Sequence, residues 1–204
     1  MKLYLIRHGE TKWNSQLRYQ GHTDVELSHN GHMQGKQLGE RMAQLEPTAI
    51  YASDLSRAYQ TAEYIAVKHN KEVKKSALLR ELNFGIWEGL TFKEINQQHQ
   101  DLATNWYKDP INLQIPNGEL FADMQKRVLE FIDYLKANYT KDTIVIVSHG
   151  GTIRTIICSL LGIDLKKMWS LKQDNTAVNI LDFYDDHVVL SLLNDTHHIK
   201  EKNN

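Results

Sequence analysis

Residues 143–151 have the sequence TIVIVSHGG, in which the run TIVIV is typical of a buried β-strand and His149 follows almost directly after it. A similar order occurs near the start of the chain, where LYLI (3–6) is followed by Arg7, His8 and Gly9. In α/β proteins with parallel sheets, ligands bind at the carboxyl ends of the strands. We therefore expect His8 and His149 to face each other at one end of such a sheet.

Outward from these two strands, strand-like and helix-like segments alternate. Ser28 is a good N-cap for a helix ending near Leu45, AIYAS (49–53) is strand-like, and a helix is expected from about Leu55 to His69. Further strands are expected at 71–78, 177–183 and 187–193, and helices at 92–98, 102–107, 120–135 and 150–161, whereas 10–26 has no regular pattern. This alternation predicts an α/β fold with a mostly parallel central sheet and helices on both faces.

Composition narrows the class of protein. The 204 residues suit one domain, and the 41% hydrophobic and 24% charged residues are typical of a globular protein. The 24 basic and 25 acidic side chains nearly balance, which argues against a surface for nucleic acid or membrane. We do not expect the N-terminal residues to be a signal peptide. The sequence has no apolar run of membrane-spanning length, and its one cysteine leaves no internal disulfide. We expect a cytoplasmic protein.

Positive charge is predicted to gather beside the two histidines. Arg57 lies in the first turn of the helix after strand 49–53, so its guanidinium can reach the same end of the sheet as Arg7. Free backbone N–H groups are expected at Gly150 and Gly151, where the next helix begins. Guanidinium groups and helix N-termini are the partners that a phosphate dianion prefers. The nearest candidate acid is Glu81, after the third strand.

Five motifs carry a resemblance to a known family: RHGET (7–11), QG (20–21), SDLSRA (53–58), ELNFG (81–85) with WEG (87–89), and SHGG (148–151). In this order they resemble the histidine phosphatase superfamily, the phosphoglycerate-mutase-like proteins. The resemblance implies a single three-layer domain over residues 1–204, with a helical insertion at about 82–118 over the active site. Within the superfamily, the sequence resembles most the small bacterial-type phosphatases, which include broad-specificity and α-ribazole phosphatases.

The resemblance also implies an activity and residue roles. The expected enzyme is a metal-independent phosphomonoester hydrolase, a phosphatase, that works through a phosphohistidine. His8 resembles the nucleophile, and Glu81 the acid that protonates the leaving oxygen and then activates water. The phosphate clamp is expected from Arg7, Arg57 and a protonated His149, with Asn14, Gln20, Gly21 and Gly150 at its edge. No metal or other cofactor is expected.

Two other functions stay open at this point: a cofactor-dependent phosphoglycerate mutase and a non-catalytic protein that binds a phosphorylated ligand. A mutase needs additional basic side chains to bind the carboxylate and the second phosphate position of its substrate. Between Glu81 and Lys126, however, the only lysines or arginines are Lys93 and Lys108. We therefore favour a phosphatase whose leaving group is partly apolar or neutral. The expected partner is a small phosphorylated metabolite, with no nucleic acid and no membrane; a homodimer is left open.

Other candidate residues have simpler interpretations. Glu88 is interpreted as part of a structural turn, and His29 and His32 as surface histidines. The stretch before His197 and His198 resembles the C-terminal strand end of some family phosphatases, so contact with the site is open. Residues 116–120 resemble a family loop, from which Asn117 and Leu120 depart.

Overall fold

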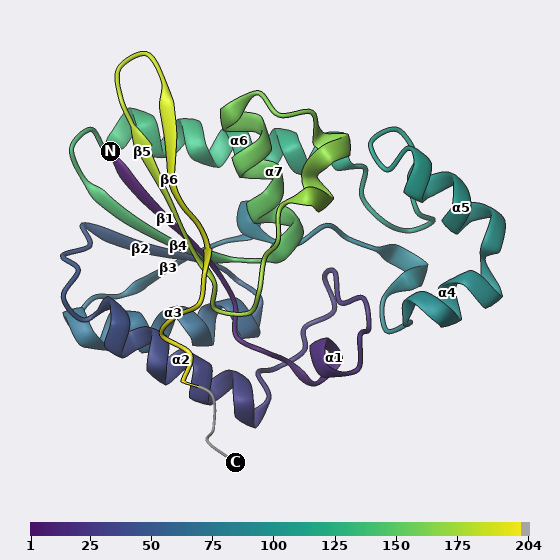
Figure 1. Ribbon diagram of the computed structural model, residues 1–204, viewed down its shortest axis with the longest axis horizontal. Helices are drawn as coiled ribbons and strands as arrows, with labels where there is room; N and C mark the ends of the chain where they lie inside the picture. Colours follow the sequence, from purple (N-terminus) through teal and green to yellow (C-terminus); the bar gives the residue numbers. More distant parts are fainter. Residues whose placement is uncertain (201–204) are drawn as a thin grey trace.

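The computed structural model describes residues 1–200 and has a six-stranded sheet in the order β3-β2-β4-β1-β5-β6 (Figure 1). The strands are β1 (Lys2–Arg7), β2 (Ala49–Ser53), β3 (Val73–Ser76), β4 (Thr143–Ser148), β5 (Val178–Phe183) and β6 (Val188–Asp195). The first four strands are mutually parallel, β5 is antiparallel to β1, and β6 is antiparallel to β5. The predicted mostly parallel sheet with a C-terminal hairpin is confirmed.

Helices cover both faces of this sheet. On one side lie α2 (His29–Met42) and α3 (Ser56–His69), and on the other α6 (Phe121–Asn138) and α7 (Gly150–Leu161) (Figure 1). The buried strand β4 serves both layers because successive side chains point to opposite faces. Its Ile144 and Ile146 belong to the core beneath α6 and α7, whereas Val145 and Val147 belong to the core beneath α2 and α3. The α/β prediction is therefore confirmed in three layers.

The remaining elements lie mostly at the carboxyl end of the parallel strands. They are α1 (Lys12–Ser15), η1 (Ala77–Leu79), η2 (Gly85–Trp87), α4 (Phe92–Gln98), α5 (Gln100–Lys108) and η3 (Leu165–Ser170). The pair α4 and α5 stands apart from the four helices that cover the sheet (Figure 1). Within residues 1–200, the structure shows no helix with the length and apolarity needed to cross a membrane.

Helix α1 corrects one prediction, because residues 10–26 were expected to be irregular throughout. A capping box starts this helix: the Thr11 side chain accepts the N–H of Asn14, and the Asn14 side chain accepts the N–H of Thr11. Other boundaries also differ: α2 ends at Met42 rather than near Leu45, α6 continues to Asn138 rather than ending near residue 135, and β3 is limited to Val73–Ser76.

Candidate active site

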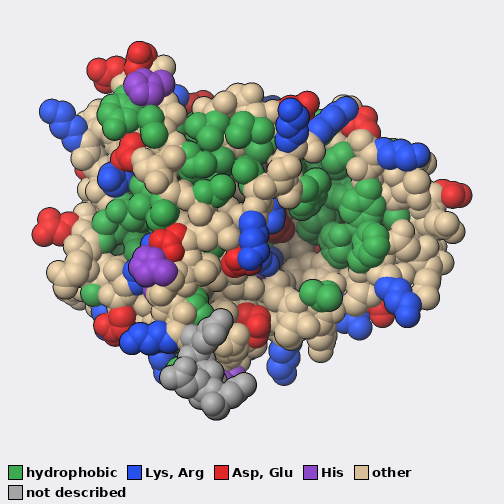
Figure 2. Space-filling view, in the orientation of Figure 1, with side chains coloured by type: hydrophobic (Ala, Val, Ile, Leu, Met, Phe, Trp, Pro, Cys, Tyr) green, Lys and Arg blue, Asp and Glu red, His purple; other side chains and the backbone are tan. Residues whose placement is uncertain are grey.

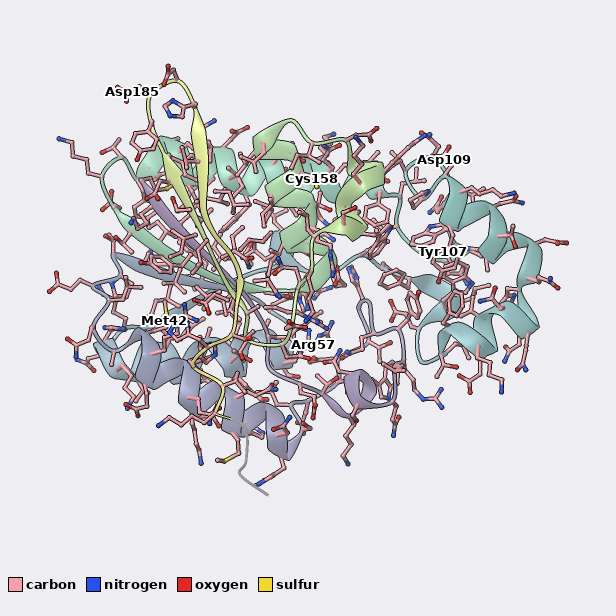
Figure 3. All side chains as sticks on the ribbon, in the orientation of Figure 1. Met42, Arg57, Tyr107, Asp109, Cys158 and Asp185 are labelled. Carbon is pink, nitrogen blue, oxygen red and sulfur yellow. The ribbon has the colours of Figure 1, made fainter. Side chains whose placement is uncertain are left out.

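The two histidines are neighbours because their strands are. Arg7 and Ser148 are paired residues of the parallel strands β1 and β4, so His8 and His149 follow at the same edge of the sheet. Their ring centroids are 5.2 Å apart, in an edge-to-face arrangement. Arg57 enters from the first turn of α3, and Figure 3 shows it among nitrogen-bearing side chains at the end of the sheet.

A cavity of about 130 Å³ opens between these side chains. The residues that line it are Arg7, His8, Asn14, Arg18, Gln20, Gly21, Arg57, Glu81, Phe84 and His149. The structure thus brings together eight of the nine residues named from the sequence, and the ninth, Gly150, lines the cavity next to it.

The His8 ring has a defined tautomer. Its Nδ1 lies 2.6 Å from the carbonyl oxygen of Gly9, and because a carbonyl only accepts, Nδ1 carries the hydrogen. Burial, followed by the charges of Arg57 and Arg7, holds the pKa of His8 well below its usual value. A neutral imidazole with hydrogen on Nδ1 leaves a lone pair on Nε2. His8 is therefore in the form that a nucleophile requires.

His149 differs from His8 in its hydrogen bonding. It is fully buried, and neither of its ring nitrogens has a hydrogen-bond partner in the described part of the chain. Burial, followed by the charges of Arg57 and His8, holds its pKa well below the usual value. In this structure burial and the neighbouring positive charges favour the neutral ring, and an adjacent anion such as phosphate would favour the charged form that was expected of His149.

The two arginines are held by backbone oxygens. Arg57 donates from Nη1 to the carbonyl of Thr23 (3.0 Å) and from Nη2 to that of Gly21 (2.7 Å). Arg7 donates from Nη1 to the carbonyl of Gln173 at 2.6 Å. Burial lowers the pKa of each guanidinium to about 10, so both remain charged at neutral pH.

Unpartnered nitrogen atoms concentrate at this cavity. Across residues 1–200, seven buried side-chain atoms lack a hydrogen-bond partner, and four of them are Nε of Arg7, Nε of Arg57 and both ring nitrogens of His149. A buried polar atom without a partner costs about 1–3 kcal/mol, so such a cluster needs an explanation. An anion with several acceptor oxygens, such as phosphate, would satisfy these groups together.

Glu81 reaches the cavity from the segment after η1. Its Oε2 accepts the N–H of Gly151 (2.9 Å), and its Oε1 accepts the N–H groups of Thr152 (3.1 Å) and Leu82 (3.0 Å). The carboxylate therefore caps the N-terminus of α7 beside the two histidines. The backbone N–H of Gly151 that was expected to be free for phosphate is used by Glu81.

Glu88 acts on the site indirectly. Its Oε1 accepts the N–H groups of His22 (2.8 Å) and Phe84 (3.1 Å), and its Oε2 accepts the N–H of Thr23 at 2.8 Å. It thereby holds the 20–23 loop whose carbonyls bind Arg57. The interpretation of Glu88 as a structural residue agrees with these contacts.

Several residues near the site were not expected from the sequence. Arg18 and Phe84 line the cavity. Asn175 donates to the carbonyl of His8 (3.0 Å), and the backbone N–H of Thr176 donates to that of Arg7 (3.1 Å). Arg18 stands two residues before Gln20 in the chain and could have been noticed there, whereas nothing in the sequence marks the 175–176 loop.

The other histidines lie outside the cavity. His198 is buried. Its Nδ1 lies 3.0 Å from Nη1 of Arg41, and its Nε2 lies 3.2 Å from the hydroxyl oxygen of Thr176. His197 is exposed and contacts Asp195, while His32 contacts the Tyr64 hydroxyl. In the part of the chain that the structure describes, no group of three or more His, Cys, Asp or Glu side chains could hold a metal ion.

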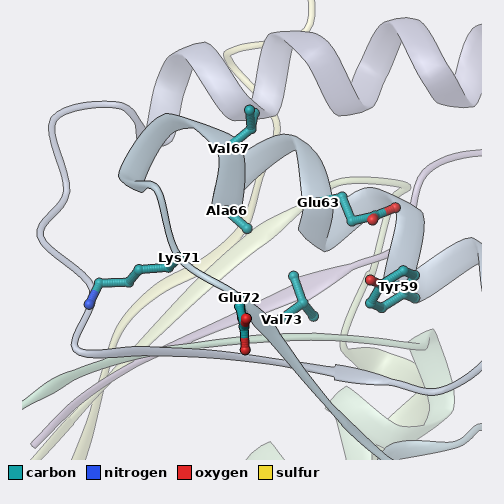
Figure 4. Close-up of a pocket in the computed structure, with 7 residues that line it drawn as sticks. All are labelled: Tyr59, Glu63, Ala66, Val67, Lys71, Glu72 and Val73. Carbon is teal, nitrogen blue, oxygen red and sulfur yellow. The ribbon is translucent and has the colours of Figure 1, made fainter.

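A larger cavity of about 610 Å³ lies elsewhere, beside the amino end of β3 (Figure 4). Its wall includes Glu63, Glu72 and Lys71, and Figure 4 shows the Lys71 side chain directed away from the two carboxylates. None of the seven unpartnered buried atoms belongs to its lining. Chemistry is therefore expected at the smaller cavity, where the unpartnered donors converge.

Comparison with known proteins decides the family. The model of the histidine phosphatase superfamily (branch 1) matches residues 3–196. The chain belongs to this superfamily. Phosphoserine phosphatase 1 of Hydrogenobacter thermophilus is 34% identical to this histidine phosphatase over 201 residues, covering 98% of this chain and 95% of the relative. Other curated relatives are named probable phosphoglycerate mutase.

Solved structures agree with this histidine phosphatase fold. The α-ribazole phosphatase of Shigella flexneri has a TM-score of 0.88 and 30% identity, with 96% of each chain covered. A mutant phosphoserine phosphatase of Entamoeba histolytica in complex with phosphoserine has a TM-score of 0.87 and 34% identity, with 98% of this chain and 99% of the other covered. The chain is a phosphatase of this superfamily.

Proposed function

We propose that this phosphatase hydrolyses phosphate monoesters of small metabolites through a phosphohistidine on His8. The observation that carries the proposal is the set of four unpartnered nitrogen atoms, from Arg7, Arg57 and His149, around a neutral His8 whose Nε2 is free. The phosphoserine complex of one similar structure supports a small phosphorylated substrate.

The first half of the reaction transfers the phosphoryl group to the enzyme. Nε2 of His8 attacks phosphorus, the bond from phosphorus to the ester oxygen breaks, and Glu81 in its protonated form gives its proton to the leaving alcohol. Arg7, Arg57 and His149 donate hydrogen bonds to the equatorial oxygens. These donors are positioned before the charge develops, so they stabilise the transition state without reorganising.

The second half releases phosphate. Glu81, now a carboxylate, takes a proton from a water molecule as that water attacks the phosphorus of phosphohistidine. The bond from phosphorus to Nε2 breaks, which releases inorganic phosphate and leaves His8 neutral. Glu81 is protonated again at the end, so the cycle closes.

Rapid quench with a ³²P-labelled monoester tests this function. Wild type should yield an acid-labile, base-stable phosphoenzyme, and His8→Ala should yield none and lose turnover. The exposed His29 provides a matched control, since His29→Ala should keep both properties. Normal turnover by His8→Ala would refute the mechanism.

Metal independence is a prediction of the same proposal. The positive charge at the phosphate position comes from Arg7 and Arg57, so activity should survive prolonged treatment with EDTA. The assay compares turnover before treatment, after it, and after addition of Mg²⁺ or Mn²⁺. Loss that either ion restores would contradict the proposal.

The mutase alternative is separated by a partition experiment. The enzyme is incubated with 3-phosphoglycerate and a trace of 2,3-bisphosphoglycerate, and the 2-phosphoglycerate formed is compared with the inorganic phosphate released. A phosphatase should release mostly phosphate. Formation of 2-phosphoglycerate in excess of hydrolysis would place the chain with the mutases.

A further inference from the structure

A second cavity of about 500 Å³ adjoins the phosphate site. The two cavities share Arg7, Arg18, Glu81 and Phe84, so a molecule whose phosphate occupies the first extends into the second. Leu82, Phe84, Phe92, Phe121 and Trp169 provide apolar walls. Figure 2 shows hydrophobic side chains gathered between η3 and the α4–α5 pair, beside a hollow. This second cavity is where the leaving group would lie.

Arg154 of α7 places a positive charge in that cavity. Its Nε donates to the carbonyl of Leu171 at 2.6 Å, and its Cζ lies 5.5 Å from the centre of the Trp169 ring. These two contacts restrict the plane and direction of the guanidinium. No hydrogen bond or ion pair with any of residues 1–200 occupies Nη1 or Nη2. This pair of nitrogens is therefore available to a ligand.

The other charged groups of this cavity either have partners already or face the phosphate position. Arg18 forms an ion pair with Glu94 at 2.9 Å. The Glu81 carboxylate accepts the backbone N–H groups of Gly151, Thr152 and Leu82. Arg7 faces the phosphate position. Among the three arginines that line this cavity, Arg154 is thus the one that neither pairs with an acid of residues 1–200 nor faces the phosphate position.

Arg154 also lies close to the phosphate position. A Cβ built on Gly150 would be 3.0 Å from Nη1 of Arg154 and 3.5 Å from Nε of Arg7, so the two guanidinium groups border the same glycine. An anionic group one or two carbons from the ester oxygen could therefore reach Arg154 while the phosphate contacts Arg7. Two parallel N–H groups suit the planar oxygens of a carboxylate.

We propose that Arg154 recognises a carboxylate on the leaving group, and that the substrates are phosphate monoesters of small hydroxy acids. This inference rests on the proposed function, because attack by His8 defines the leaving group. It also modifies the expectation of a neutral leaving group, which considered only the cations between Glu81 and Lys126. Arg18 and Arg154 reach the cavity from outside that segment.

Matched substrates test the proposal directly. O-phosphoserine is compared with O-phosphoethanolamine, which lacks only the carboxylate, and 3-phosphoglycerate with glycerol 3-phosphate, in which a hydroxymethyl group replaces it. In wild type, kcat/KM should be about ten- to hundredfold higher for the carboxylate member of each pair, the size typical of a charge-assisted hydrogen bond. A ratio near one in both pairs would overturn the proposal, whatever the variants do.

The Arg154→Met variant then assigns the preference to this residue. Its ratio of kcat/KM values within each pair should fall to near one, and Arg154→Lys should give an intermediate ratio. The control is Lys167→Met, which removes an exposed cation from the neighbouring η3 and should keep the wild-type ratio. An equal fall for both members of a pair in Arg154→Met would overturn the proposal, because Arg154 would then act on the phosphate or on the fold.

A separate measurement distinguishes this inference from the function on which it rests. Hydrolysis of p-nitrophenyl phosphate and the phosphoenzyme on His8 report on the catalytic centre without involving a carboxylate. If both are present in wild type but the ratios are near one, only the carboxylate proposal fails. If both are missing, the proposed function itself fails.

Discussion

At the scale of single residues, the cavity assigns different tasks to groups of similar chemistry. His8 and His149 are both buried and both have lowered pKa values, yet only His8 has a backbone carbonyl that fixes its tautomer. His149 has no partner for either nitrogen among residues 1–200, so its hydrogen can be directed to a ligand. One ring is thus prepared to attack and the other to donate.

The first prediction concerns His149. His149→Ala should lower kcat about 10²–10³-fold, the loss typical of one preorganised donor at a developing negative charge. Steady-state assays with one good monoester measure the change, and the Tm shows whether the fold persists. A fall in kcat below threefold would mean that His149 does not contact the transferring phosphoryl group.

The second prediction concerns Glu81. A general acid matters most when the leaving group is poor, so Glu81→Gln should lower hydrolysis of alkyl phosphates by about 10²–10⁴-fold. The leaving group of p-nitrophenyl phosphate barely needs a proton, so phosphorylation of His8 by this ester should continue. Dephosphorylation then becomes limiting, and stopped-flow traces should show a burst of p-nitrophenol. Equal losses for both kinds of ester, without a burst, would contradict the role of Glu81.

At the scale of elements, the start of α7 connects the fold to the chemistry. A Cβ at Gly151 would lie 2.5 Å from Oε1 of Glu81, so only glycine lets the carboxylate approach the helix N-terminus this closely. The glycine at the other end of α7, Gly162, is required for a different reason: its φ is +66°, while a Cβ built there would meet no other atom within 4 Å.

The third prediction follows from this contrast. Gly151→Ala should displace Glu81 and lower kcat for alkyl phosphates by about ten- to hundredfold, because small misplacements of a catalytic group are costly. Its stability should be close to that of wild type, since alanine favours the helix. Gly162→Ala should lose about 1 kcal/mol of stability, from the left-handed backbone, and keep its kcat. Parallel kinetics and urea unfolding check both, and unchanged kcat in Gly151→Ala would contradict the account.

At the scale of the whole molecule, buried histidines make stability depend on pH. His8, His149 and His198 all have lowered pKa values in the folded state, that of His198 falling to about 4 through burial and then the charge of Arg41. The unfolded chain, with histidine pKa values of about 6.5, binds more protons below that pH. Their full contribution to the free energy of unfolding is therefore present above about pH 6.5. It is lost as the pH falls toward the pKa values that these histidines have in the folded state.

The fourth prediction tests this dependence. The free energy of unfolding should fall between pH 6.5 and 4.5, by up to about 1.4 kcal/mol per pH unit for each histidine that stays unprotonated. Urea unfolding at several pH values measures the slope, and His198→Asn should reduce it. The carboxylates with lowered pKa values, such as Asp54 and Asp195, lose their stabilising contribution only below about pH 5, so the slope between pH 6.5 and 5 reports on the histidines. A flat profile between pH 6.5 and 4.5 would contradict the prediction.

The sequence by itself determined the elements that depend on short windows of the chain. The bounds of β2, α4 and α7 agree with the predicted ranges, because hydrophobic period and helix caps act over a few neighbouring residues. The expected meeting of His8 and His149 also needed only local information, namely two strands that each end in a histidine, together with the rule for parallel sheets.

Only the tertiary structure decided the protonation and pairing of the site. Burial and partners far away in the chain decide three features of the site. These are the neutral state of His149, the hydrogen bond from the Gly151 N–H to Glu81, and the unpaired Nη1 and Nη2 atoms of Arg154. Desolvation and unsatisfied hydrogen bonds arise when packing brings distant segments together and removes water. No window of the sequence contains that information, so the fold could be predicted in outline while the chemistry of its cavity could not.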